Sequence, residues 1–395
     1  MTSRGTSGAP TVPPWVPSLD LLLRDAIRRV PLIAFATPTN FETEVERVVA
    51  SLERGELVEP AFTYRPVPDG LPDVAAALGA LVRGLPDDPL ARVYARRALQ
   101  VCGDLHWARD LESGIATAAG AQRFPRRDEC DDEGDVLALR WALAGASAVS
   151  GAQAGAVVTG GPYRAREPQR ETDLEHEARF ESERAGAIVS DDEADPRSLV
   201  SRMRQEIGAR RLAARVVVVR GIAPLAATGD GLVQVAAARR VSPADVERTV
   251  AHEIEGHLVP SCIAREKRIG IFALGTVNGT GDQEGRALAI ERRLGHLDLL
   301  RMRTLGLRHM AARAAHRGCD FIPMVEELRK LGAMPRESVR LAARAFRGGG
   351  LGREAVYIPG LLRVDAAVAK DPSIDSVLAN GRVGVDDAEA LRPWI

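Results

Sequence analysis

The stretch His252-Glu253-Ile254-Glu255-Gly256-His257 places two imidazoles and a carboxylate within a few residues of one another. A helix that carries this combination can hold zinc and activate water. The common zinc-peptidase motif spaces its two histidines four residues apart, on one face of a helix. Here the spacing is five residues, which turns the two rings roughly 140° apart on a regular helix. The sequence therefore predicts that the helix bulges or ends near Gly256, where glycine makes such a distortion least costly.

A helix and a small sheet are predicted directly before this stretch. Ser242 is a suitable N-cap, Pro243 suits the first helical position, and Asp245 follows three residues after the cap. Upstream, the β-branched run at 214–219 is the strongest strand signal in the chain, and a second strand is predicted at 232–235 after a glycine-rich turn. These strands favour a small sheet beside an active-site cleft.

A third metal ligand is expected downstream, because zinc peptidases use three protein ligands and keep one position open. A long helix is predicted from Asp282 to about Leu305, with Glu284 in its first turn. The connection from His252 is long enough for this helix to fold back onto the first. Acidic residues are also favoured in first turns by the helix dipole. Glu255, three residues after His252, is a competing ligand from the motif itself.

Composition narrows the class of protein. With 395 residues, the chain is expected to form two domains or one enlarged by insertions. Hydrophobic residues make up 45% and aromatic residues only 4%, which favours packed helices rich in Ala, Leu and Val. A net charge of -1 gives no overall attraction to nucleic acid, and no apolar run is long enough to span a membrane. The cysteines are far apart, which indicates reduced thiols and a cytoplasmic protein. They are Cys102, Cys130, Cys262 and Cys319.

The chain is predicted to have four parts. Residues 1–17, rich in Ser, Gly, Thr and Pro, are expected to be a disordered leader, and residues 18–158 an N-terminal helical region. Residues 159–195 read as a polar insertion, in which His176 has no second ligand spaced to join it. Residues 196–395 carry the histidine motif. Helices are predicted at 18–30, 40–52, 71–84, 88–102, 134–150 and 196–212.

Two motifs resemble those of the microtubule-associated tyrosine carboxypeptidases and their bacterial relatives. His252-Glu253-x-x-x-His257 looks like the family's H-E-x-x-x-H, and Gln283-Glu284-Gly285-Arg286-Ala287 looks like its Q-E-G-L-A, with Arg286 in place of leucine. The resemblance spans most of residues 39–382 and is sharp at these two motifs. It implies that the five-residue histidine spacing is a family trait.

Three further segments are similar to the family's pattern. Arg347-Gly348-Gly349 followed by Tyr357-x-x-Gly360 resembles a downstream R-G…Y-x-x-G. Weaker echoes lie at Asn40 and at Pro60-x-Phe62-x-Tyr64.

The resemblance implies a zinc metallopeptidase that releases a C-terminal residue. In it, His252, His257 and Glu284 would be the zinc ligands and Glu253 the general base, which takes a proton from water and passes it to the leaving amine. Glu255 ranks below His257 as a ligand on this match. Glu255 and Arg286 are departures that could alter metal preference, substrate choice or activity.

A carboxypeptidase must also bind a terminal carboxylate, and a guanidinium does so bidentately. Arg344, Arg347 and Arg353 are the candidates; Arg347 leads because the neighbouring glycines let the backbone approach a ligand. Tyr357 is predicted to donate its phenol to the developing oxyanion, although a buried structural tyrosine is an equal alternative. The remaining downstream histidines match no family motif and are interpreted as non-ligands. They are His296, His309 and His316.

The prediction is a mostly helical α+β protein, with a zincin-like catalytic region and a small β-sheet. The predicted function is zinc-dependent removal of a C-terminal residue from a peptide or protein. One alternative is a non-catalytic regulatory relative that keeps the fold; the other is a zinc endopeptidase. An intact Glu253 favours an enzyme, and an arginine-closed end of the cleft would favour cleavage at the chain end.

Overall fold

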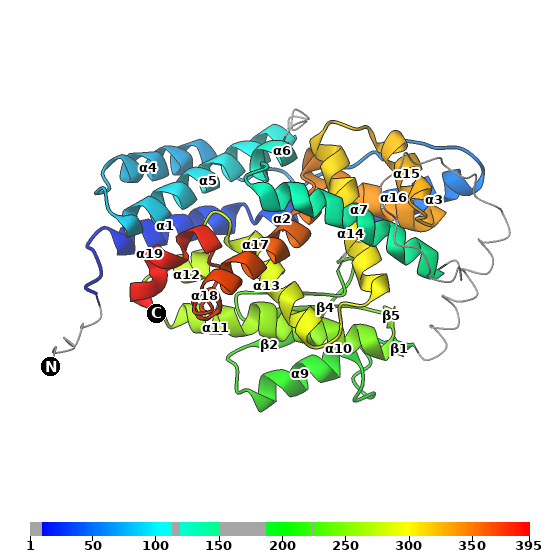
Figure 1. Ribbon diagram of the computed structural model, residues 1–395. Helices are drawn as coiled ribbons and strands as arrows, with labels where there is room; N and C mark the ends of the chain where they lie inside the picture. The colour runs from blue at the N-terminus through cyan, green and yellow to red at the C-terminus, as the bar shows by residue number, and fades with distance from the viewer. Residues whose placement is uncertain (1–9, 113–118, 150–186, 223) are drawn as a thin grey trace.

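The computed structural model describes residues 10–112, 119–149, 187–222 and 224–395 (Figure 1). Most of the predicted polar insertion, with His176, and residues 1–9 of the predicted leader lie outside the described residues. The chain is mostly helical with small sheets, which confirms the predicted α+β class. The helices before the insertion are α1 (Val16–Arg29), α2 (Leu32–Ala36), α3 (Phe41–Glu53), α4 (Leu71–Arg83), α5 (Pro89–Glu112), α6 (Ala119–Arg123) and α7 (Glu129–Val149).

The N-terminal helices form one core with distant parts of the chain. On α1, Leu19, Leu23 and Ala26 recur at helical spacing and are fully buried. The same cluster contains Phe272 from α12 (Ile271–Leu274) and Leu391 from the C-terminal α19 (Ala388–Leu391). Figure 1 shows α1, α4 and α5 as a layer above α12, α18 and α19. The predicted helices of this part are all present, and α5 and α7 run further than expected.

A three-stranded sheet lies directly before the histidine motif. Its strand order is β2-β4-β3, with β2 (Arg215–Val219) parallel to β4 (Leu232–Ala236) and β3 (Ala226–Gly229) antiparallel to β4. The turn from β3 to β4 is Asp230-Gly231, with positive φ at both residues, as a tight hairpin requires. The strands predicted at 214–219 and 232–235 are thus present. A second, two-stranded sheet pairs β1 (Ile188–Val189) with β5 (Arg240–Val241).

The buried face of the three-stranded sheet packs on two helices. Val233 and Val235 of β4 are buried together with Met203 of α9 (Leu199–Ala209) and Val250 of α10 (Pro243–Ala251). This core anchors the helix that leads into the histidine motif.

The prediction of a single helix from Asp282 to about Leu305 is wrong, because the structure has two helices here. Helix α13 (Gly279–Arg293) ends, the chain turns at Gly295 with a φ of +78°, and α14 (Leu299–His316) begins. Positive φ is readily adopted only by glycine, so Gly295 stops the first helix. Asp298 then caps α14 by accepting a bond from the Arg301 amide at 2.7 Å. The break turns α14 back, so that it can contribute side chains to the site built on α13.

The remaining helices lie in the centre, lower part and upper right of Figure 1. They are α11 (Val259–Arg265), α15 (Phe321–Lys330), α16 (Pro335–Gly350), α17 (Tyr357–Lys370) and α18 (Ile374–Leu378), with short 3-10 turns at Arg353–Val356, Val385–Asp387 and Arg392–Trp394. Within α16 the helical backbone is interrupted at Arg347, Gly348 and Gly349. The chain therefore changes direction there before it enters the turn at Arg353–Val356, here called η2.

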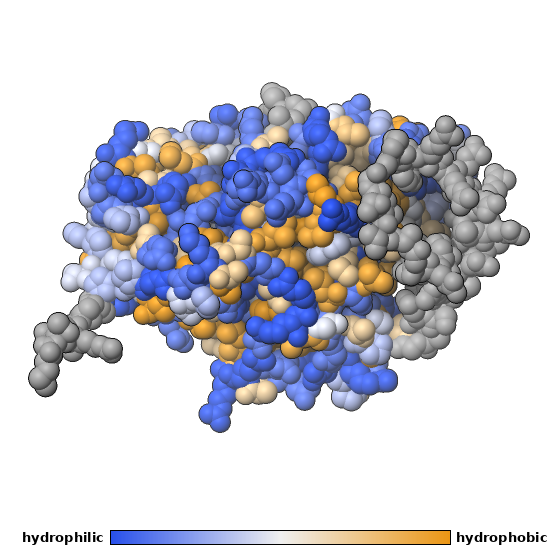
Figure 2. All heavy atoms as spheres, viewed as in Figure 1, coloured by the Kyte–Doolittle hydropathy of each residue, from blue (hydrophilic) through white to orange (hydrophobic). Residues whose placement is uncertain are grey.

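The viewed surface mixes hydrophilic and hydrophobic residues (Figure 2). Hydrophobic residues gather in the middle of this face, in the area of α7 and α17 in Figure 1, and α7 exposes Val136, Leu139 and Leu143. Among the described residues, no helix combines the length and apolarity that crossing a bilayer requires. The four cysteines are free.

Candidate metal centre

The histidine motif forms a π-helical turn, η1 (His252–Leu258), between α10 and α11. Helix α10, which leads into this turn, starts at the predicted capping box, in which Ser242 and Asp245 exchange bonds. In a π-helix the bonds run from residue i to residue i+5, so a residue five positions later lies above the first. The predicted distortion between His252 and His257 is therefore confirmed.

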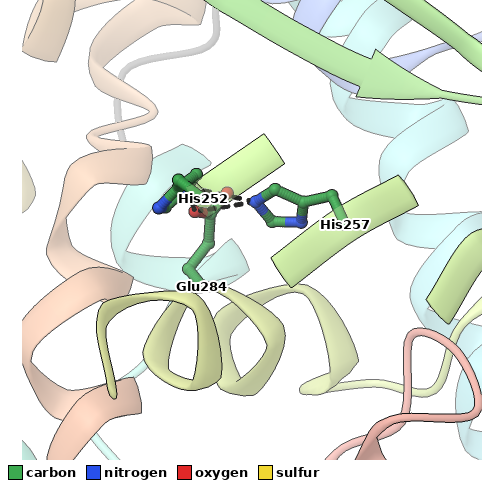
Figure 3. Close-up of side chains that lie close together, drawn as sticks. All are labelled: His252, His257 and Glu284. Carbon is green, nitrogen blue, oxygen red and sulfur yellow. Dashed lines mark hydrogen bonds and ion pairs between the residues drawn. The ribbon is translucent and has the colours of Figure 1, made fainter. Parts of the chain in front are cut away.

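Three side chains meet where this turn crosses α13 (Figure 3). The Nε2 atoms of His252 and His257 lie 3.1 Å apart. The Oε2 atom of Glu284 lies 3.3 Å from Nε2 of His252 and 3.5 Å from Nε2 of His257. The structure thus brings together the three residues predicted as ligands, and in the described part of the chain no other group of three His, Cys, Asp or Glu residues does the same.

The donor set fits a divalent metal ion. Zinc–ligand distances of about 2.0–2.2 Å at tetrahedral angles put neighbouring donor atoms about 3.3–3.6 Å apart, which is close to the three separations observed. Glu284 Oε2 is buried without a hydrogen-bond partner, as is Oε2 of the neighbouring Glu253. Buried carboxylate oxygens are costly unless paired or bound to a cation. Two imidazoles, one carboxylate and an open side are the donor set of a catalytic zinc site.

A second carboxylate fixes the orientation of His252. Glu291, fully buried on α13, lies 2.7 Å from His252 Nδ1 and accepts its proton in a hydrogen bond. Arg301 from the start of α14 holds Glu291 through two bonds of 2.9 and 2.8 Å. Burial raises the pKa of the Glu291 carboxyl, but its bonds to His252 and Arg301 outweigh burial and lower it to about 2. Glu291 therefore stays ionised and directs Nε2 of His252 toward the cluster.

Contacts with carboxylates also favour the protonated form of His252 when no ion is bound. Burial disfavours the imidazolium, but the adjacent carboxylates of Glu284 and Glu291 outweigh burial and raise the pKa of His252 to about 10. A metal ion and a proton therefore compete for His252 Nε2.

Replacing Glu291 with glutamine is expected to weaken metal binding by about 10- to 100-fold, because second carboxylates of this kind orient the ligand histidine. The change preserves shape and removes the charge. Competition with a chelator of known affinity measures the loss. Glu247→Gln is the matched control, since Glu247 is exposed and pairs with Arg202. Equal affinities in the two variants would remove Glu291 from the metal centre.

The other oxygen of Glu284 is held by an arginine. Arg353 in η2 donates to Glu284 Oε1 at 2.7 Å, which leaves Oε2 for the histidine side. Burial opposes ionisation of Glu284, yet the charges of His257 and Arg353 hold its pKa well below the usual range. Arg353, predicted to bind substrate, is thus in direct contact with a predicted metal ligand.

Arg347 and Arg344 lie beside this pair and share one carboxylate. Arg344 donates to Glu354 Oε1 at 2.9 Å and Arg347 donates to the same oxygen at 3.1 Å. Both arginines line one pocket together with Arg353. Arg347 is only 7% exposed. Its assignment to substrate, like that of Arg353, stays a prediction.

Comparison with known proteins identifies a family. The sequence model of the microtubule-associated tyrosine carboxypeptidase family matches residues 165–395, more than half of the chain. The chain belongs to this family. No match was found among curated proteins. Among solved structures, the chain is similar to a candidate lipoprotein from Colwellia psychrerythraea, with 12% identity and a TM-score of 0.43, over 97% of this chain and 76% of that one.

Four glycines let three helices approach one another closely. A Cβ atom added to Gly256 would lie 2.6 Å from Cβ of Ala287, the last residue of the Q-E-G-x-A motif. One added to Gly285 would lie 2.1 Å from the carbonyl carbon of Gly360, and one added to Gly360 would lie 2.3 Å from the carbonyl oxygen of Gly281. Helix α13 is therefore clamped between η1 and α17. This close packing fixes Glu284 against the histidines.

The two segments that weakly resemble the family's pattern, at Asn40 and at 60–64, are in contact. Asn40 donates to the carbonyl of Ala61 at 2.8 Å and accepts from the amide of Thr63 at 2.9 Å. The segment it holds ends at Tyr64, whose hydroxyl accepts a bond from the Gly348 amide at 3.1 Å. These contacts brace the loop that leads to Arg353.

The other residues considered near the metal site have partners outside the ligand cluster. Glu255 pairs with Arg210 at 2.6 Å, and Arg286 bonds Asp375 at 2.7 Å. Neither side chain belongs to the metal-ligand cluster. His309 bonds Asp135 at 2.6 Å, His316 bonds the carbonyl of Leu351 at 3.0 Å, and His296 is also outside the cluster.

Sequence reasoning missed Glu291 and Arg301. Glu291 follows Glu284 by seven residues, which is two helical turns and therefore the same face. That spacing is the signal that could have identified it. Arg301 lies beyond the break at Gly295. In the continuous helix that was predicted, Arg301 would have lain further along the helix and could not have reached Glu291.

Proposed function

We propose that this chain is a zinc-dependent carboxypeptidase that removes the last residue of a peptide or protein. The observation that carries the proposal is the convergence of His252, His257 and Glu284 within 3.1–3.5 Å. Membership of a family described as carboxypeptidases supports the reaction class. Zinc is proposed because the two imidazoles and one carboxylate match the donor set of zinc peptidases.

His252, His257 and Glu284 would hold the ion, with Glu291 orienting His252. When bound, zinc polarises a carbonyl group and makes water acidic enough to react near neutral pH. Glu253 follows His252 in the π-helical turn, is 8% exposed, and has one oxygen without a partner. We assign it the role of general base, which accepts a proton from the attacking water and delivers it to the leaving amine.

Recognition of the chain end is assigned to the arginine-lined pocket. Arg353 lines this pocket and bonds Glu284, and Arg344 and Arg347 line the same pocket. A guanidinium binds a carboxylate through two parallel bonds, which fixes the last residue and excludes chains that continue. Tyr357 is buried at the start of α17, and burial and then the Glu284 charge raise its phenol pKa. A phenol that stays protonated can donate to a developing oxyanion.

Two further predictions remain. The chain is divided at 158/159 and 195/196, and the protein is located in the cytoplasm. The two helical parts share one hydrophobic core. Residues 196–395 would therefore depend on the N-terminal helices for stability.

The zinc-loaded full chain is expected to release single amino acids from peptides with a free C-terminus and to leave the same peptides intact when the C-terminus is amidated. Mass spectrometry of the products measures both outcomes. Internal cleavage of the amidated peptides would indicate an endopeptidase instead. Stoichiometric zinc without any hydrolysis across peptides that end in each of the common residues would indicate a regulatory relative.

A further inference from the structure

The two oxygens of Glu284 face different partners. Oε2 lies 3.3 Å from Nε2 of His252 and 3.5 Å from Nε2 of His257, and it has no hydrogen-bond partner. Oε1 accepts a hydrogen bond of 2.7 Å from the guanidinium of Arg353. The side chains of Glu284 and Arg353 are 6% and 21% exposed, so solvent screens their ion pair only weakly. One oxygen is therefore available to an ion, and the other is engaged.

The turn η2 fixes Arg353 through both of its neighbours. Gly352 has a φ of +52°, and a Cβ atom added there would lie 2.5 Å from Nε2 of His316, so the backbone contacts α14 closely at this point. Glu354 is 3% exposed and accepts hydrogen bonds from two arginines of α16. The backbone on both sides of Arg353 is thus held, and its guanidinium is directed at Glu284.

The described residues give the cluster two nitrogen ligands and one oxygen ligand. Among them, Glu284 is the one carboxylate that belongs to the group of converging donor atoms. Glu253, Glu255 and Glu291 lie outside this group, and the last two bond other side chains. The most direct source of a further protein oxygen is therefore Oε1 of Glu284.

Divalent ions differ in how many oxygen ligands they prefer. Zinc is held in tetrahedral sites by imidazole and carboxylate groups. Calcium takes about six to eight oxygens and commonly binds both oxygens of one glutamate, and manganese suits carboxylate and water ligands in octahedral sites. An ion of the second kind would gain from Oε1 as a ligand, but it would have to displace Arg353.

We propose that Arg353 confines Glu284 to one ligating oxygen and thereby makes the cluster select zinc over manganese and calcium. In this role Arg353 is a positioning residue, because it acts on the ion through Glu284. The inference rests on the metal centre of the proposed function and concerns the identity of the ion. It does not require hydrolysis.

Metal competition tests the selection. The affinities of the metal-free full chain for zinc and for manganese are measured against chelators of known affinity, and the same is done for two variants. Arg353→Met, which is unbranched and has no hydrogen-bond donor, is expected to lower the ratio of zinc to manganese affinity by about 10-fold or more, the usual size of an effect exerted through a ligand. Arg353→Lys keeps a charge and a donor and is expected to retain much of the ratio. An unchanged ratio in Arg353→Met would overturn the inference.

Arg292→Met is the matched control. Arg292 lies on α13, the helix that carries Glu284, and donates two hydrogen bonds of 2.7 Å to Asp365. Its side chain is 51% exposed. This variant should keep the ratio of the original chain. An equal fall in Arg292→Met and Arg353→Met would also overturn the inference.

Cobalt reports the coordination of the ion in the original chain without any substitution. Tetrahedral cobalt(II) absorbs visible light far more strongly than octahedral cobalt(II), because the octahedral ion has a centre of symmetry. The cobalt-loaded original chain is therefore expected to absorb strongly, and Arg353→Met to absorb less. Weak absorption by the original chain would overturn the inference, including in the case that Arg353→Met does not fold.

Failure of this inference and failure of the proposed function give different results. A chain that selects zinc through Arg353 but releases no amino acid would keep the inference and reject the carboxypeptidase. A chain that hydrolyses peptides but has the same ratio of zinc to manganese affinity with and without Arg353 would keep the carboxypeptidase and overturn the inference.

Discussion

Glu253→Gln is expected to retain about one zinc ion per chain and to lose hydrolysis by a factor of about 10² to 10⁴, the usual contribution of a general base. The substitution keeps the shape of the side chain and removes its ability to accept a proton. Because Glu253 is absent from the group of converging ligand atoms, zinc content should not change. Single-turnover hydrolysis and metal analysis on the same preparation measure the two quantities.

Glu255→Gln is the matched control for this result. Glu255 lies two residues further along the same turn and pairs with Arg210 on its outer side. Its replacement is expected to leave both zinc content and hydrolysis unchanged. A Glu253→Gln chain that hydrolyses peptides at the original rate would contradict the mechanism, even if the ligand set were correct.

Gly285→Ala is expected to destabilise the protein by about 3 kcal/mol or more and to reduce zinc binding. Overpacking a close contact typically costs about 1–3 kcal/mol. Here the added methyl group meets backbone of Gly360 at 2.1 Å, which cannot rotate away as a side chain could. Relief requires α13 and α17 to separate, and that movement displaces Glu284 from the histidines. Urea unfolding and zinc titration measure the two effects.

Gly103→Ala provides the control for the glycine substitution. Gly103 lies inside α5, and an added Cβ there would meet nothing within 4 Å. Alanine in an open helical position is expected to be neutral or to stabilise by up to about 1 kcal/mol. If Gly285→Ala were as stable as Gly103→Ala and kept its zinc, the clamp between α13 and α17 would not position the ligand.

The central part of the site was predictable because its signals are local. Five-residue spacing with a glycine between His252 and His257 demands a departure from the α-helix, and the π-helical turn provides it. Glu284 was identified by a family resemblance, since its position in a first turn has an ordinary explanation in the helix dipole. The fold class followed from composition and from the β-branched strand at 214–219.

The supporting residues were not predictable because they depend on how distant helices meet. Gly295 was read as part of a helix interior, so Arg301 was placed on the same helix as Glu291 and the contact between the two could not be inferred. Arg347 was chosen for its neighbouring glycines, and these gave no sign that its side chain is buried against Glu354. Burial of a charged group follows from tertiary packing, which local sequence patterns do not encode.

Zinc titration of the metal-free full chain and of Glu284→Ala tests the central claim most directly. The account predicts one tight site per chain in the original protein and loss of that site in Glu284→Ala, with the variant still folded by circular dichroism. Retention of the tight site in Glu284→Ala, or failure of the original chain to bind zinc, would contradict the assignment of His252, His257 and Glu284 as a metal centre.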